Sequence, residues 1–114
     1  MSIRRIDVGP RMSQAVIRND TIYLSGMVGE GEGVAAQASD ILANIDTLLA
    51  KAGSDKSKLL QAVIWLTDIS TFAEMNAVWE SWIDKANPPA RATVEAKLAS
   101  PKYKIEIMVT AAAG

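Results

Sequence analysis

Residues 87–110 read NPPARATVEAKLASPKYKIEIMVT, and this stretch decides the fold class. It contains two runs in which apolar and polar residues alternate, a pattern typical of half-buried β-strands. The apolar side chains of the two runs are Ala92, Val94, Ala96 and Leu98, then Tyr103, Ile105, Ile107 and Val109. The opposite faces carry Arg91, Thr93, Glu95 and Lys97, then Lys104, Glu106, Met108 and Thr110. The stretch therefore predicts two closing strands, joined by the tight connection 99–102.

A second helix is predicted just before this pair of strands. Thr71 and Glu74 match a capping box at its start, and Pro88-Pro89 require it to end near Asn87. Asn76 interrupts the apolar stripe, so we expect its amide to hydrogen-bond a neighbouring loop rather than a ligand. The apolar stripe itself comprises Phe72, Met75, Trp79, Trp82 and Ile83.

The middle of the chain predicts one helix and one strand. From Val34 the apolar residues recur at helical spacing, and Gly53 follows as a stop signal. Residues 59–66 form a nearly continuous apolar run, which predicts a strand buried on both faces.

The N-terminal third predicts three strands and a loop. Residues 3–8 form a short strand that Gly9-Pro10 ends, and the runs 15–17 and 22–24 flank Asn19-Asp20 as in a hairpin. Residues 26–33 hold four glycines and two glutamates. This loop lacks the Gly-Lys-Ser/Thr ending of a phosphate-binding loop, and its acids would repel phosphate.

The element order is therefore β-β-β-α-β-α-β-β, in one domain over residues 1–114. Such an order is typical of an α+β fold in which two helices pack on one face of a mixed sheet. The opposite face, expected to carry Met27 and Met108 among charged residues, has no helix to cover it. We therefore expect a homotrimer or another homo-oligomer.

Composition excludes several kinds of chemistry. The chain has no cysteine and no histidine, which rules out disulfides, thiol nucleophiles, Ser-His triads and thiolate or imidazole metal sites. With 12 basic and 13 acidic residues, no charge excess predicts binding to nucleic acid. No apolar run approaches the ~20 residues of a membrane span, and residues 1–5 lack a secretory signal's apolar region. We expect a cytoplasmic protein with no membrane partner.

Two residues are candidates for chemistry. Arg91 follows the stiff lead-in Asn87-Pro88-Pro89-Ala90, where a guanidinium suits bidentate capture of a carboxylate. Glu106 interrupts an apolar strand, where burial would raise its pKa toward that of a general acid or base. For each residue, an ordinary surface or structural role is the favoured alternative on these patterns alone.

The predicted hairpin sets the distance between them. If residues 99–102 form the turn, Glu95 lies opposite Glu106 and Arg91 lies opposite Thr110. Arg91 and Glu106 are then four residues apart along the sheet, roughly 13 Å at strand rise. The two could serve one small ligand only across a cleft, for example one shared between subunits.

Several motifs together resemble one protein family. Residues 89–96 (PARATVEA) and 104–107 (KIEI) resemble the closing signature of the Rid family, the reactive intermediate deaminases, also known as YjgF-type or L-PSP endoribonuclease-like proteins. The resemblance covers essentially the whole chain in the right order. Weaker matches are Gly9-Pro10 with residues 13–16 (SQAV), residues 23–26 (YLSG), Asn44 and residues 76–79 (NAVW).

This resemblance implies a chorismate-mutase-like (ferredoxin-like) fold and homotrimers with pockets between subunits. It implies that Arg91 grips a substrate carboxylate and that Glu106 orients or activates water, while Ser25, Gly26 and Thr93 line the pocket. The implied reaction needs neither metal nor cofactor. Water adds to a reactive 2-imino or 2-enamino acid, and ammonia leaves a 2-keto acid.

Three departures from the family pattern concern substrate range. The N-terminal motif has one residue more than the family pattern and carries Arg11 where the family has a tyrosine. Met27 follows Ser25-Gly26 at a position where the family commonly has a glutamine. The loop before the first helix is short. Three rival functions stay open. They are a non-catalytic ligand sensor or partner-binding trimer, a ribonuclease, which the lack of histidine disfavours, and a chorismate mutase, which rests on fold analogy alone.

Overall fold

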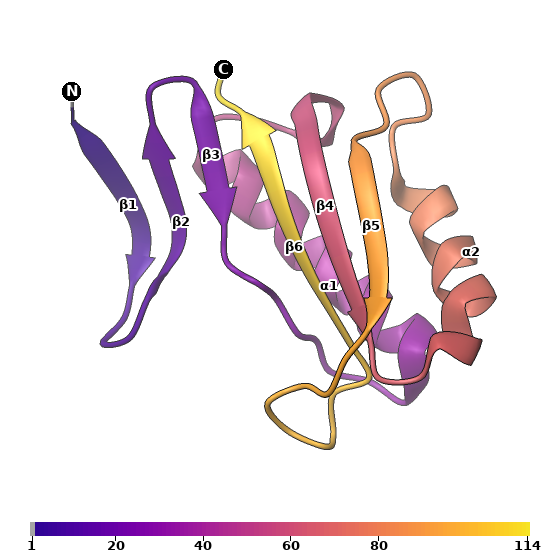
Figure 1. Ribbon diagram of the computed structural model, residues 1–114. Helices are drawn as coiled ribbons and strands as arrows, with labels where there is room; N and C mark the ends of the chain where they lie inside the picture. The colour runs from indigo at the N-terminus through magenta and orange to yellow at the C-terminus, as the bar shows by residue number, and fades with distance from the viewer. Residues whose placement is uncertain (1) are drawn as a thin grey trace.

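The computed structural model describes residues 2–114 as a six-stranded mixed sheet with two helices packed on one of its faces (Figure 1). The element order and the α+β class predicted from the sequence are both confirmed. Across the sheet the strands run β1-β2-β3-β6-β4-β5, so β1 and β5 are the edge strands. The elements are β1 (Ile3–Val8), β2 (Ser13–Arg18), β3 (Thr21–Leu24), α1 (Gly33–Lys51), β4 (Leu59–Leu66), α2 (Phe72–Trp82), β5 (Ala90–Glu95) and β6 (Ile105–Ala112).

The β2–β3 hairpin forms as predicted. Arg18 pairs with Thr21, so Asn19 and Asp20 make the two-residue loop. Asn19 has a φ of 54°, in the left-handed region that asparagine tolerates better than most residues. The predicted loop also lies where it is expected, between β3 and α1, although it ends one residue earlier because α1 begins at Gly33.

The hydrophobic core lies between the helices and one face of the sheet. Every second residue is buried along β6 and, after an irregularity between Leu59 and Gln61, along β4 from Ala62, as period-2 geometry requires. Other residues of β4 are not buried: Leu60 is 50% exposed, and Val63 and Trp65 are partly exposed. The expectation of a strand buried on both faces is therefore wrong, because no element covers the second face. Core residues include Ile41, Ile45, Leu49, Ala62, Ile64, Leu66, Met75, Trp79, Ile105, Ile107 and Val109.

The closing strands differ most from the prediction. β5 pairs in parallel with β4, and β4 lies between β5 and β6, so the predicted hairpin of β5 and β6 does not exist. The chain leaves β5 at Glu95 and returns at Ile105, a connection too long for a tight turn. Two backbone bonds hold this connection to the end of β4: Ala96 N–H donates to Leu66 O, and Thr67 N–H donates to Lys104 O.

Helix α2 begins and ends differently from the prediction. The capping box is absent, because the Thr71 hydroxyl donates to the Asp68 carbonyl and Glu74 accepts from the backbone of Ala35. The preceding turn is capped by Asp68, and hydrogen bonds from Ser70 lower the pKa of the Asp68 carboxyl. The helix ends at Trp82, before the expected end near Asn87, because the backbone turns extended at Ile83.

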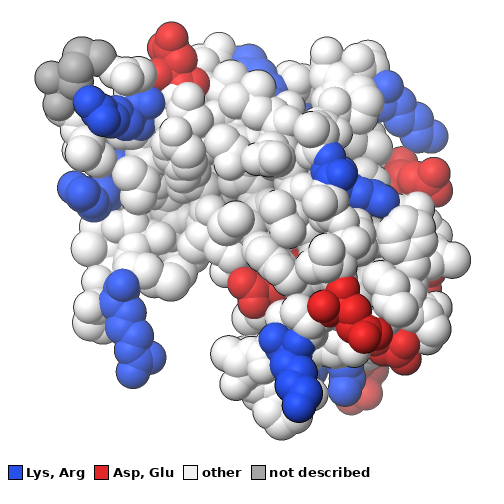
Figure 2. All heavy atoms as spheres, viewed as in Figure 1, with Lys and Arg blue, Asp and Glu red and all other residues white. Residues whose placement is uncertain are grey.

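The second face of the sheet is open. We call this uncovered face the open face. Figure 2 shows it from the front, with a broad area free of charged side chains and charged groups mostly around the margin. Its exposed apolar side chains include Tyr23 (52% exposed), Val94 (44%) and Met108 (38%). Met27, expected on this face, packs instead against the core. Within residues 2–114, no helix combines the length and the hydropathy needed to cross a membrane.

Candidate functional site

Glu106 lies on the open face, near the middle of the sheet. Its neighbours Ile105 and Ile107 are buried toward the helices, so the strand period directs Glu106 to the other side. It is half-buried and pairs with Trp65 of β4, which in turn pairs with Val94 of β5. Glu95, expected opposite Glu106, lies instead in the row of Leu66. Two facing carboxylates are therefore not a feature of this site.

Gly26 lies beside Glu106, and Ser25 precedes it directly after the end of β3. Met27 and Ile107 exchange both backbone hydrogen bonds, which fixes the segment after β3 against β6. A Cβ added to Gly26 would collide with Glu106 Oε2 and lie 3.2 Å from its Cδ. Ser25 is held by Gln14, to whose side-chain oxygen its hydroxyl donates at 2.9 Å.

The Glu106 carboxylate has free hydrogen-bonding capacity. Among residues 2–114, no group donates a hydrogen bond to it and no cation forms an ion pair with it. A half-buried carboxylate of this kind can accept a hydrogen bond from a water molecule or a ligand.

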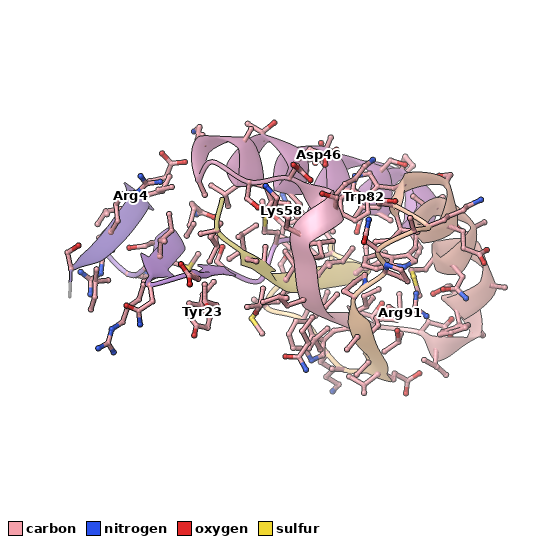
Figure 3. All side chains as sticks on the ribbon, turned by 90° about the horizontal axis from the view of Figure 1, so that it is seen from above. Arg4, Tyr23, Asp46, Lys58, Trp82 and Arg91 are labelled. Carbon is pink, nitrogen blue, oxygen red and sulfur yellow. The ribbon has the colours of Figure 1, made fainter. Side chains whose placement is uncertain are left out.

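Arg91 lies on the other face of the sheet, between β5 and α2 (Figure 3). Its Nη1 donates to Asn76 Oδ1 at 2.8 Å. The guanidinium carbon lies 5.7 Å from the ring centre of Phe72 and 5.5 Å from that of Trp79, within cation–π range. The guanidinium also lines a pocket of 390 Å³ together with Asn76, Trp79, Glu80, Ile83, Lys85 and Pro88.

Thr93 shares the face of Arg91. It pairs with the buried Ile64 of β4, and its hydroxyl oxygen is buried without a hydrogen-bond partner among residues 2–114. An unpaired buried hydroxyl is uncommon in native proteins. The polar side of β5 therefore faces α2, whereas the alternating apolar residues Ala92 and Val94 face outward.

Arg91 and Glu106 do not meet within one chain. Arg91 pairs with Ala62, which pairs with Val109, and Val109 is three residues from Glu106 along β6. An odd separation places the two side chains on opposite faces, and β4 separates their strands. The structure thus gathers Glu106, Gly26 and Ser25 on the open face and Arg91 and Thr93 on the helix face. One ligand can contact both groups only if two copies of the chain contribute.

Two features of this region were not foreseen. Asn76 was expected to bind a loop, but its partner is the candidate residue Arg91; the polar interruption of the apolar stripe was its only signal. Gln37 is the second: it is 4% exposed, its Nε2 donates to the carbonyls of Gly31 and Lys102, and its Oε1 accepts from Lys104 N–H. It joins the loop beside Gly26 to the segment that leads into Glu106.

The six-stranded mixed sheet with two helices on one face defines a class of small α+β proteins. A member of the YjgF protein family from Neisseria meningitidis has the same fold, with a TM-score of 0.96, 50% identity, and coverage of 100% of this chain and 97% of that one. The family model described as Endoribonuclease L-PSP matches residues 2–113. The chain therefore belongs to the Endoribonuclease L-PSP family, the family that the sequence resembles.

Curated relatives agree with this assignment. A RutC family protein of Haemophilus influenzae is 44% identical, over 97% of this chain and 98% of its own length. A human protein named 2-iminobutanoate/2-iminopropanoate deaminase is 34% identical, over 94% of this chain and 82% of its own length. The family thus includes a named imine deaminase.

Proposed function

We propose that this protein is a deaminase that hydrolyses reactive 2-imino and 2-enamino acids to 2-keto acids and ammonia. The observation that carries the proposal is the Glu106 carboxylate, half-buried on the open face with no hydrogen bond from residues 2–114. A carboxylate in this setting can hold a water molecule and take its proton. The name of the human relative supports imines as the substrate.

The proposed reaction divides the work between two residues. The Arg91 guanidinium binds the substrate carboxylate, and Glu106 holds water beside the C=N carbon. As the water oxygen bonds to that carbon, Glu106 accepts a proton from the water and passes it to the imine nitrogen, which gives a carbinolamine. Glu106 then takes the proton of the new hydroxyl group and delivers it to the amine nitrogen. The C–N bond of the adduct then breaks, ammonia leaves, and a 2-keto acid remains. Positioning supplies most of the rate, because it converts an encounter with bulk water into an oriented one.

Two copies of the chain are needed to complete such a site. Arg91 lies on the edge strand β5, whereas Glu106 lies near the middle of the open face. A second copy whose β5 edge rests on the open face would bring its Arg91 toward Glu106 and would cover Tyr23, Met108 and Trp65. We propose a homotrimer, because a closed ring repeats this head-to-tail contact without leaving an open end.

An imine-hydrolysis assay tests the proposed activity. 2-Aminoacrylate or 2-iminobutanoate is generated in situ, and ammonia release is followed above the uncatalysed rate. Arg91→Ala should reduce the catalysed rate at least about a hundredfold, because it removes the carboxylate anchor. Arg4→Ala, at an exposed arginine of β1 that pairs with Ile17 on the helix side of the sheet, is the matched control and should keep full activity. Turnover that persists in Arg91→Ala would refute the role of Arg91.

A second function is supported by one observation. The Arg91 pocket is complete within a single chain and does not include Glu106. It could therefore bind a 2-keto acid without any turnover, as a sensor would. Calorimetry with 2-ketobutyrate separates the two functions: binding without catalysed ammonia release would favour the sensor.

A further inference from the structure

One face of α2 holds the guanidinium of Arg91. Phe72, Asn76 and Trp79 are spaced i, i+4 and i+7, so they lie along a single face of the helix. We call this face the α2 cradle. Asn76 Oδ1 accepts a hydrogen bond of 2.8 Å from Arg91 Nη1, and the two aromatic rings lie 5.7 and 5.5 Å from the guanidinium carbon.

The cradle restrains the charged group without neutralising it. A long arginine side chain loses rotamer freedom when it binds a ligand, and that loss weakens binding unless the free protein has already restrained the side chain. Neither the Asn76 amide nor an aromatic ring carries a net charge, so the positive charge of Arg91 stays available. One N–H bonds Asn76, and among residues 2–114 no other acceptor takes a hydrogen bond from the remaining donors of the guanidinium, which can therefore bind an anion.

We infer that Asn76 is a positioning residue, which acts through Arg91 to set the affinity for the substrate carboxylate. The inference rests on the proposed function and deepens it. Asn76 touches no reacting atom; it fixes the direction of the guanidinium. The carboxylate is held equally in the bound substrate and in the transition state, so Asn76 acts on KM and leaves kcat nearly unchanged.

Two substitutions of Asn76 test this role. Asn76→Ala removes one hydrogen bond to a charged group and should raise KM about tenfold, with kcat within about twofold. Asn76→Asp keeps the acceptor but adds a negative charge beside the guanidinium. It should raise KM more than Asn76→Ala does, because the aspartate competes with the substrate carboxylate. Asn44→Ala, at an exposed asparagine of α1, is the matched control and should leave KM unchanged.

Phe72 gives an independent test, because it is 38% exposed and contributes little to the core. Phe72→Leu removes the ring and should raise KM about two- to fivefold, the value of an exposed cation–π contact. Phe72→Tyr keeps a ring and should restore the wild-type KM. A cradle that matters only for folding would lower the urea midpoint in both Asn76→Ala and Phe72→Leu while leaving KM unchanged, and that result would overturn the inference.

The assays also separate failure of this inference from failure of the proposed function. If the wild-type protein does not hydrolyse imines, the proposed function fails, and the cradle is tested by the affinity of Arg91 for 2-ketobutyrate in calorimetry. If the wild type is active and Arg91→Ala is not, while neither Asn76 variant changes KM or this affinity, only the positioning role fails. A fall in kcat alone would also count against it.

Discussion

The Glu106 carboxylate lies so close to Gly26 that it limits the size of the residue that position 26 can hold. The carboxylate occupies the space in which any side chain at position 26 would begin. Gly26 does not need a left-handed backbone, since its φ is not positive. Position 26 therefore needs a glycine because it has no side chain, and the Glu106 carboxylate, the candidate water-binding group, fills the space that a side chain would take.

Gly26→Ala should displace the Glu106 carboxylate without unfolding the protein. We expect kcat to fall about 10- to 100-fold, because a general base that has moved no longer meets the water proton. The loss of stability should stay within about 1 kcal/mol, because the backbone conformation suits alanine. Imine hydrolysis and urea unfolding measure the two quantities.

Gly9→Ala is the comparison for this prediction. A Cβ at Gly9 would make only an ordinary contact, 3.5 Å from the Met12 carbonyl oxygen, so its kcat should match the wild type. If Gly26→Ala is as active as Gly9→Ala, imine hydrolysis does not depend on the observed position of the Glu106 carboxylate, and the prediction fails.

At the scale of elements, Gln37 joins α1 to two loops. Its amide bonds the loop that contains Gly31 and the segment from Lys102 to Lys104. Gln37→Leu would leave two carbonyls and one N–H without partners inside the protein. We expect a loss of about 2–4 kcal/mol in the free energy of unfolding.

Urea titration followed by tryptophan fluorescence measures this loss, and Gln61→Ala serves as the control at an exposed glutamine. A change below about 0.5 kcal/mol in Gln37→Leu, similar to an ordinary surface substitution, would contradict the role of Gln37 as a joint between these segments.

The elements themselves were predictable, but the neighbours of the last two strands were not. The Asn19-Asp20 hairpin followed from turn chemistry, because a two-residue loop brings its flanking strands together. The alternation of apolar and polar residues in β5 and β6 shows that each strand has two different faces. It does not show which strand pairs with β5 or with β6. Insertion of β4 between them depends on distant backbone bonds, which leave no local pattern in the sequence.

The same limit applied to the candidate site. Arg91 and Glu106 were identifiable as residues, because one follows a stiff Pro-Pro segment and the other interrupts an apolar strand. Their faces were not identifiable, since Ala92 and Val94 suggested that the apolar side of β5 faces the core. In the structure the polar side faces α2 instead. An apolar strand face that no element of its own chain covers has the same sequence pattern as a core face.

At the scale of the whole molecule, the two faces of the sheet predict complementation between variants. Arg91→Ala and Glu106→Gln should each be inactive alone. If the chains are unfolded, mixed in equal amounts and refolded together, about a quarter of the sites should combine an intact arginine from one copy with an intact glutamate from another.

Ammonia release from the co-refolded mixture, compared with the two variants refolded separately, measures this recovery. An inactive mixture that contains mixed oligomers by native mass spectrometry would place both groups of each site in the same chain. It would thereby contradict a site built from two copies.

The opposite orientation of Arg91 and Glu106 also determines how a defective chain would affect the normal chains made beside it. If each chain lends its arginine to one neighbour and its glutamate to the other, a chain that lacks both groups disables two sites at once. In a cell that makes such a defective chain beside the normal one, activity would fall as the square of the normal fraction. A mutation in one gene copy would then lower the total activity by more than the share of chains that carry it.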